Sequence, residues 1–199
     1  MRQTTLCIAS NNVHKIEEIR DIIDSQFDLV NLDQIGCNEE LPETRDTIEG
    51  NSLQKAEYVF QNYHVPCFAD DSGLEVAALN GEPGVFSARY AGDHKNSDDN
   101  IDLLLKNLSD NPNRQARFRT VITVIGLEQK PTFFEGVVNG TIINSRRGTS
   151  GFGYDPIFVP EGYSKTYAEM TMPEKSTLSH RAIAVKKLET YLKNHISSR

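Results

Sequence analysis

Residues 67–73 read Cys-Phe-Ala-Asp-Asp-Ser-Gly, an apolar run that leads directly into two adjacent carboxylates, Asp70 and Asp71. The apolar run predicts a buried strand that ends at these acids. Ligands in open α/β sheets bind beyond the carboxyl ends of strands, where two carboxylates can hold a divalent cation or activate a water. An acidic turn explains the same residues, because Asp, Ser and Gly all favour turns. The segment alone leaves both interpretations open.

The chain on either side of this strand alternates between strand and helix patterns. Expected strands are apolar runs at 4–9, 27–30 and 156–159, and a hairpin of 117–127 with 132–138. Expected helices carry apolar residues at helical spacing: Val13, Ile16, Ile19 and Ile23; Leu53, Ala56, Phe60 and Tyr63; Ile101, Leu104, Leu105 and Leu108; and Val185, Leu188 and Leu192. This order predicts an α/β fold. Because no internal repeat or linker is visible, residues 1–199 are expected to form a single interleaved domain.

Composition limits the class of protein. The 28 acidic and 21 basic residues give a net charge of −7. This charge argues against general binding to nucleic acid or a membrane surface, because both require a basic surface. No apolar run approaches the ~20 residues of a membrane span, and the N-terminus lacks the features of a signal peptide. Cys7, Cys37 and Cys67 form no CxxC motif, so we expect neither zinc nor a disulfide framework and favour a reducing cytoplasm.

The first strand–helix junction contains Ser10-Asn11-Asn12-Val13-His14-Lys15. Backbone amides at the start of a helix attract anions, so the short polar side chains and Lys15 can form a phosphate cradle. An ordinary capped helix with a solvated lysine explains the same residues. The junction therefore predicts a helix cap in either case and a phosphate site in one of them.

The second expected helix follows an acidic segment. Asp46 and Glu49 predict a capping box at its start, with Asp in place of the usual Ser or Thr. Lys55 shares a helix face with Asn51, opposite the apolar stripe, where a solvated lysine is expected unless that face borders a cleft. Glu43 belongs to the acidic segment, either as part of a solvated loop or as an oxygen ligand for a cation at the acid pair.

Two later motifs carry similar alternatives. Ser179-His180-Arg181 opens the last helix and places potential cations in the first turn, where the helix dipole disfavours positive charge. Either a ligand or a nearby carboxylate paired with Arg181 would explain this arrangement.

Residues 151–156 set Phe152 and Tyr154 between glycines, so the aromatic rings either stack on a nucleotide base or fill the core.

Four blocks together resemble the inosine triphosphate pyrophosphatase family: FADDSGLEV at 68–76, PGVFSARYAG at 83–92, GFGYDPIF at 151–158 and SHR at 179–181. The resemblance extends from Ser10 to Arg181. It implies Mg²⁺-dependent hydrolysis of non-standard purine nucleoside triphosphates (ITP, dITP and XTP) to the monophosphate and pyrophosphate, which cleanses the nucleotide pool. The implied architecture is a central mixed, elongated sheet flanked by helices, with two lobes around a nucleotide cleft. A homodimer acting on a small-molecule substrate is also implied.

The resemblance assigns roles by position. Asp71 is implied as the general base, and Glu43 and Asp71 as the Mg²⁺ ligands, with Asp70 close to the site. The implied triphosphate-binding residues are Ser10, Asn12, Lys15 and Lys55. The other implied substrate-binding residues are Ser72, Phe152, Gly153, Tyr154, Asp155, Lys175, His180 and Arg181; among these, Phe152 stacks on the purine, and Lys175, His180 and Arg181 lie along the base and its 6-oxo group.

The chain departs from the family pattern at two places, and two other functions would fit the same motifs. Many relatives have Gly where this chain has Arg45, and the usual Glu before Asn51 is Gly50 here. A related pyrophosphatase for modified pyrimidine or methylated nucleotides, or a catalytically silent nucleotide-binding protein, would share the same motifs. A donor aimed at a 6-oxo group explains the rejection of adenine, whose 6-amino group would face that donor, but it does not explain the rejection of guanine.

Overall fold

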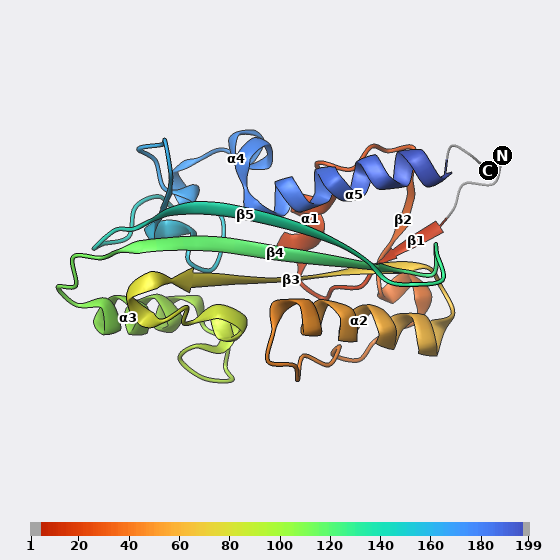
Figure 1. The fold of residues 1–199 in the computed structure, drawn as a ribbon, viewed down its shortest axis with the longest axis horizontal. Coiled ribbons are helices and arrows are strands. Elements are labelled where there is room, and N and C mark those ends of the chain that lie inside the picture. The colour runs from red at the N-terminus through yellow and green to blue at the C-terminus, as the bar shows by residue number, and fades with distance from the viewer. Residues whose placement is uncertain (1–4, 197–199) are drawn as a thin grey trace. The chain divides into compact units, whose positions relative to one another are not determined.

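The computed structural model describes residues 5–196, which contain a six-stranded sheet in the order β2-β1-β3-β4-β5-β6 (Figure 1). Strand β1 pairs in parallel with β2 and β3, whereas β5 and β6 are antiparallel, so the sheet is mixed. The strands are β1 (Thr5–Ile8), β2 (Asp28–Val30), β3 (Cys67–Val76), β4 (Gln115–Ile125), β5 (Thr132–Ile142) and β6 (Phe158–Pro160). The α-helices are α1 (Val13–Arg20), α2 (Ile48–Tyr63), α3 (Ser97–Leu108), α4 (Met172–Leu178) and α5 (His180–Ile196). The predicted α/β class with a mixed sheet is confirmed.

The described chain divides into two compact units. Unit 1 comprises residues 5–71, 120–136 and 181–196, and unit 2 comprises residues 72–119 and 137–180. Strands β3, β4 and β5 each contribute residues to both units. The two units correspond in number to the two expected lobes, while the single domain over 1–199 and the cleft stay predictions. Within residues 5–196, no helix is both long and apolar enough to cross a bilayer.

In unit 1, helices cover both faces of the sheet, because alternate strand residues point to opposite sides. Leu6, Ile8 and Phe68 share a core with residues of α1 and α5. Cys7 and Cys67 share the other core with residues of α2. Figure 1 shows α2 on one side of these strands and α1 with α5 on the other. A strand buried on both faces must be apolar at every position, which explains the continuous apolar run before the acid pair.

In unit 2, one core joins the strands to α3. Leu74 of β3 and Phe118 of β4 pack in the same cluster as Ile101, Leu104 and Leu108, the apolar stripe predicted for the third helix. Asn96 caps α3 by accepting the backbone N–H groups of Asp98 and Asp99. The helix and its stripe therefore form as the periodicity predicts.

The strand of the acid pair is longer than expected. Strand β3 continues through Asp70 and Asp71 to Val76, so the prediction that it ends at the acids is wrong. Its parallel partner β1 ends at Ile8, which lies opposite Phe68. The two acids therefore lie just past the carboxyl end of the neighbouring strand rather than at the end of their own. That position still corresponds to the sheet edge where α/β proteins bind ligands.

Several boundaries differ from the predictions. The first strand covers Thr5–Ile8, and residue 4 lies outside the described residues. Strand β6 begins at Phe158, after a 3₁₀ turn at Asp155–Ile157 that contains Pro156. In α1, Ile19 is buried as expected, but Val13 at the first turn is 63% exposed. Helical spacing identified the helix but not where its apolar contacts begin.

The start of α2 corrects the predicted capping box. The N-cap is Thr47, whose hydroxyl accepts the backbone N–H of Gly50 at 3.0 Å, and not Asp46. Shifting the cap by one residue moves the helix start to Ile48, which is buried. Phe60, placed on the apolar stripe by the prediction, is 36% exposed, whereas Asn51 and Lys55 are buried. The buried face of α2 is therefore partly polar.

We expect Thr47→Ala to lower the free energy of unfolding by about 1 kcal/mol, because the Gly50 N–H loses its acceptor. Asp46→Ala is the matched control, since Asp46 is exposed and lies one residue away. It should change the free energy of unfolding by less than about 0.5 kcal/mol. Urea denaturation of both variants measures the difference, and a larger loss for Asp46→Ala would contradict the assigned cap.

Candidate active site

The loop after β1 forms a polar turn at the start of α1. Asn12 is the N-cap and accepts the backbone N–H of Lys15 at 3.2 Å. Ser10 Oγ accepts the backbone N–H of Asn12 at 3.2 Å. The Nζ atom of Lys15 lies 3.1 Å from Oδ2 of Asp70. A freely solvated Lys15 is therefore excluded, and the predicted cap is confirmed.

Asp70 is a buried anion with two cationic partners in unit 1. Besides Lys15, the Nε atom of Arg181 donates to Asp70 Oδ2 at 3.2 Å. Burial alone would raise the pKa of Asp70, but the charges of Lys15 and Arg181 outweigh burial and hold that pKa well below its usual range. Asp70 is therefore ionised and is engaged in ion pairs.

Arg181 begins the part of α5 that belongs to unit 1, and the residue is 1% exposed. Its Nη1 group donates to Glu18, a buried residue of α1. Burial would lower the pKa of Arg181, yet Glu18 and Asp70 raise it, so the guanidinium stays charged. The interpretation that a nearby carboxylate pairs with Arg181 is confirmed, and its role beside the base stays a prediction.

Lys55 bridges two carboxylates on the buried polar face of α2. Its Nζ atom lies 2.5 Å from Oε1 of Glu43 and 3.7 Å from Oδ1 of Asp71. Burial would lower the pKa of Lys55, but Asp71 and Glu43 together raise it. The expectation of a solvated lysine on this face is wrong, because tertiary partners replace the water.

The segment that carries Glu43 is tied to α2. Asn51 Oδ1 accepts the backbone N–H of Arg45 at 2.8 Å. Gln54 Oε1 accepts the backbone N–H of Thr44 at 2.9 Å. A Cβ atom at Gly50 would lie 2.7 Å from Cβ of Arg45, so the two positions that depart from the family pattern touch each other. Glu43 is thus held by helix side chains rather than by a solvated loop.

Asp71 has the features of a base and a metal ligand. Its Oδ2 atom is buried and has no hydrogen-bond partner among residues 5–196. Burial raises the pKa of Asp71, and the opposing attraction of Lys55 and Lys15 does not cancel the increase. A carboxylate with a raised pKa and one oxygen, Oδ2, that accepts no hydrogen bond from the described residues suits a bound cation or an activated water.

The residues of unit 1 fit a divalent cation. Glu43 and Asp71 each place a carboxylate oxygen within 3.7 Å of the Lys55 ammonium, so this region stabilises positive charge. In the described chain, no cluster of three or more His, Cys, Asp or Glu residues is placed to hold a metal. Mg²⁺ commonly uses one or two carboxylates and completes its shell with water and phosphate oxygens. Two ligands are therefore sufficient for Mg²⁺.

In unit 2, Asp155 organises the glycine-rich loop. Its Oδ2 atom accepts the backbone N–H of Phe152 at 2.9 Å and lies 2.6 Å from Nζ of Lys175. A Cβ atom at Gly151 would come within 2.1 Å of the same oxygen, so only glycine fits there. The Lys175 ammonium lies 4.9 Å from the centroid of the Phe152 ring. Phe152, Asp155 and Lys175 are therefore brought together as the resemblance implied.

The other predicted residues of unit 2 differ in their surroundings. Gly153 has a positive φ of 59°, and the Tyr154 hydroxyl donates to the backbone oxygen of Ser87 at 2.9 Å. Tyr154 is 3% exposed, so the core-filling interpretation holds for this ring, whereas Phe152 is only half-buried. His180 is buried, and Ser72 follows Asp71 in β3.

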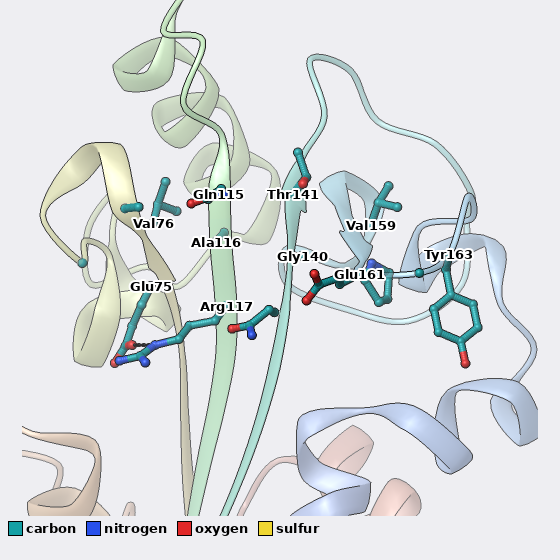
Figure 2. Close-up of a pocket in the computed structure, with 15 residues that line it drawn as sticks. Glu75, Val76, Gln115, Ala116, Arg117, Gly140, Thr141, Val159, Glu161 and Tyr163 are labelled. Atoms are coloured by element: carbon teal, nitrogen blue, oxygen red, sulfur yellow. Dashed lines mark hydrogen bonds and ion pairs between the residues drawn. The ribbon is translucent and has the colours of Figure 1, made fainter.

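A separate cavity of about 770 Å³ lies in unit 2 (Figure 2). Its lining includes side chains of β4 and β5, and the Nε atom of Arg117 lies 2.5 Å from Oε2 of Glu75 across one side. No residue predicted for the nucleotide site lines this cavity. The residues of the predicted nucleotide site therefore lie outside this cavity.

A model of the Ham1 family matches residues 6–191. The chain belongs to the Ham1 family. It is 54% identical over 183 residues to the dITP/XTP pyrophosphatase of Flavobacterium johnsoniae, covering 92% of this chain and 95% of that protein. The corresponding Porphyromonas gingivalis protein of the same name is 53% identical over 188 residues, covering 94% and 96%.

Solved structures agree with this membership. The Staphylococcus aureus Ham1 protein matches with a TM-score of 0.88 at 38% identity, covering 96% of this chain and 99% of that one. A Ham1 protein from Coxiella burnetii matches with a TM-score of 0.89 at 34% identity, covering 96% and 100%. The resemblance inferred from the four sequence blocks is confirmed.

In this Ham1 chain, two residues contact predicted site residues although the sequence did not indicate that they would. Glu18 holds Arg181, and Phe118 stacks on His180 with ring centroids 4.6 Å apart. Glu18 directly precedes the buried Ile19, and a charged residue beside a core position was the available signal. Phe118 occupies an ordinary core position in β4, so its pattern gave no signal.

We expect Asp70→Asn to lower the free energy of unfolding by about 3–5 kcal/mol near pH 7, because Arg181 loses one of its two carboxylate partners and Lys15 loses its partner in a buried site. The pKa of Asp70 is lower in the folded chain, so its contribution is complete above the ordinary carboxyl pKa of about 4 and is lost as pH falls further. The difference from wild type should therefore narrow in acid.

Asp71→Asn is the matched control for this measurement in metal-free buffer. Because burial raises the pKa of Asp71, removing its charge should leave the free energy of unfolding unchanged or increased. Urea denaturation at several pH values compares the two variants. Equal losses from both variants would contradict the different electrostatic environments assigned to the two acids.

Proposed function

We propose that this Ham1 protein hydrolyses non-standard purine nucleoside triphosphates, namely ITP, dITP and XTP, to the monophosphate and pyrophosphate. The observation that carries the proposal is the buried Asp71 Oδ2 without a hydrogen-bond partner within residues 5–196, beside Lys55 and Glu43. The relatives named dITP/XTP pyrophosphatase support the substrate class. Acid anhydride hydrolysis is chemistry that a base and a cluster of cations can catalyse.

Unit 1 would bind the triphosphate and carry out the reaction. Lys15 and Lys55 neutralise phosphate charge, and Ser10, Asn12 and the first amides of α1 donate to phosphate oxygens. Asp71 takes a proton from the attacking water as the bond between the α- and β-phosphates is hydrolysed. Mg²⁺ held by Glu43 and Asp71 would supply further neutralisation of the developing negative charge.

Unit 2 would read the base. The half-buried Phe152 ring offers a face for purine stacking, and Asp155 fixes both this loop and Lys175. Lys175 and His180 are the proposed groups of this unit along the 6-oxo edge, with Gly153 and Tyr154 shaping the pocket and Ser72 adjoining Asp71. Arg181, which follows His180 in the chain and belongs to unit 1, is proposed for the same edge. A donor that meets the 6-oxo group leaves the 6-amino group of adenine facing a donor, and such unpaired buried groups give strong discrimination.

The proposal also covers the oligomeric state, the compartment and the cofactor of the enzyme. We propose a homodimer of single-domain chains in the cytoplasm, with Mg²⁺ as the cofactor. The three cysteines are free and buried, which supports a reducing compartment. Burial raises the pKa of Cys7 and Cys67 to about 12, so these thiols are unreactive and fit a core role.

A substrate panel tests the proposed activity directly. The protein is incubated with Mg²⁺ and ITP, XTP, ATP, GTP or a pyrimidine triphosphate, and released pyrophosphate is measured. We expect ITP and XTP to be cleaved with a kcat/KM at least about 100-fold above that for ATP, because an unpaired buried polar group discriminates strongly. Equal rates for ATP would contradict the selectivity, and faster cleavage of pyrimidines would favour the related pyrophosphatase.

In the same assay, Asp71→Asn should release pyrophosphate about 100-fold more slowly or worse, since proton transfer by a positioned base contributes at least that factor. Its folding is checked by the urea denaturation described above. Full activity in a folded Asp71→Asn protein would contradict the base assignment. Tight ITP binding without pyrophosphate release by the wild type would instead support a silent nucleotide-binding protein.

Glu43→Gln tests the metal role separately from the base. We expect the Mg²⁺ concentration for half-maximal activity to rise about tenfold or more, because one of two anionic ligands is lost. Glu40→Gln is the matched control: it removes an exposed acid from the same segment and should leave the Mg²⁺ dependence unchanged. Titration of activity with Mg²⁺ compares them, and identical curves for Glu43→Gln and wild type would exclude Glu43 as a ligand.

A further inference from the structure

We propose that Phe118 is a positioning residue that fixes the plane of the His180 imidazole and thereby sets selectivity for 6-oxo purines. The inference rests on the proposed function, because it concerns how His180 meets the base. Both residues lie in unit 2, with Phe118 in β4 and His180 at the first position of α5.

The two rings form a parallel stack. Their centroids are 4.6 Å apart, and the planes differ by 9°. Phe118 is 8% exposed and His180 is 4% exposed, so the stack is shielded from water. Parallel planes at this separation define the plane of the imidazole as well as its place.

Phe118 also contacts two further aromatic rings. Phe158 meets it edge-on, with centroids 4.7 Å apart and planes at 70°. Tyr167 lies 5.9 Å from Phe118 and 6.2 Å from His180, tilted by about 30° to each ring. Of the two rings that contact His180 here, Phe118 is the one that lies parallel to the imidazole, whereas Tyr167 is tilted.

The plane matters because the ring nitrogens of histidine lie in it. The χ2 torsion of histidine has a broad energy profile, so the side chain alone does not fix the direction of its N–H group. A stacked aromatic neighbour restricts this rotation. Phe118 therefore keeps the His180 nitrogens in one plane, and through this plane affects how well a 6-oxo group is distinguished from a 6-amino group.

The first test compares Phe118→Leu with a matched control, Phe158→Leu. Both variants remove one ring from the same core cluster, but Phe158 has its ring contacts with Phe118 and Tyr167. We expect Phe118→Leu to lower the ratio of kcat/KM for ITP to that for ATP by about five- to tenfold, within the upper half of the energy range of one aromatic stack. Phe158→Leu should keep this ratio within about twofold of wild type. Phe118→Tyr, which retains the ring, should restore it.

This ratio separates positioning from a loss of folded protein. Partial unfolding lowers the rates for ITP and ATP together and leaves their ratio unchanged. A changed ratio in Phe118→Leu with an unchanged ratio in Phe158→Leu supports the proposal. Equal changes of the ratio in both variants, or no change in either, would overturn it.

Proton NMR supplies a readout that does not depend on activity. A histidine stacked on an aromatic face has its ring protons shifted upfield, and His180→Gln identifies the His180 signals among the five histidines. We expect those signals to move downfield in Phe118→Leu and to stay in place in Phe158→Leu. If Phe118→Leu does not fold, the wild-type signals decide: unshifted His180 protons overturn the proposal.

The two proposals fail in different ways. A wild-type protein that cleaves none of the purine triphosphates contradicts the proposed function, while the NMR comparison still decides whether Phe118 holds His180. Cleavage of ITP with unshifted His180 signals keeps the function and removes the positioning role.

Discussion

The rest of unit 1 depends on a negative charge kept in its interior at Asp70. Burying a carboxylate is costly unless cations and hydrogen bonds compensate it. Here Lys15 comes from α1 and Arg181 from α5, and Arg181 is in turn paired with Glu18 of α1. Two helices are thereby fixed to the central strand next to the carboxyl end of β1, and this same arrangement holds Lys15 at the proposed phosphate site.

Adjacent acids in one strand acquire opposite properties through their neighbours. Asp70 has two cations within 3.2 Å and a lowered pKa. Asp71 faces Lys55 at 3.7 Å, with Glu43 competing for the same ammonium, and its pKa is raised. Successive strand residues point to opposite faces of the sheet, so the two carboxylates meet different helices. The strand geometry itself separates a structural ion pair from a group able to accept a proton.

The sequence predicted the helices and strands more completely than it predicted the contacts between residues distant in the chain. Periodicity located every long helix and the β4–β5 hairpin, because those signals are local. It missed the extension of β3 through the acids and the burial of Lys55, since both depend on partners distant in the chain. Glu18 and Arg181 are 163 residues apart, and no local pattern links them. The four blocks identified the family and most proposed site residues, whereas Phe118 appeared as one more core aromatic.

The two departures from the family pattern, at positions 45 and 50, do not displace Glu43 from Lys55. Arg45 and Gly50 are in contact, since a Cβ atom at position 50 would lie 2.7 Å from Cβ of Arg45. A larger residue at 45 therefore requires the smallest residue at 50, and the two changes compensate for each other in volume. The backbone N–H of Arg45 still donates to Asn51, which holds the Glu43 segment against α2. Glu43 thus reaches Lys55 despite both changes, because Asn51 sets the path of the segment independently of the side chains at 45 and 50.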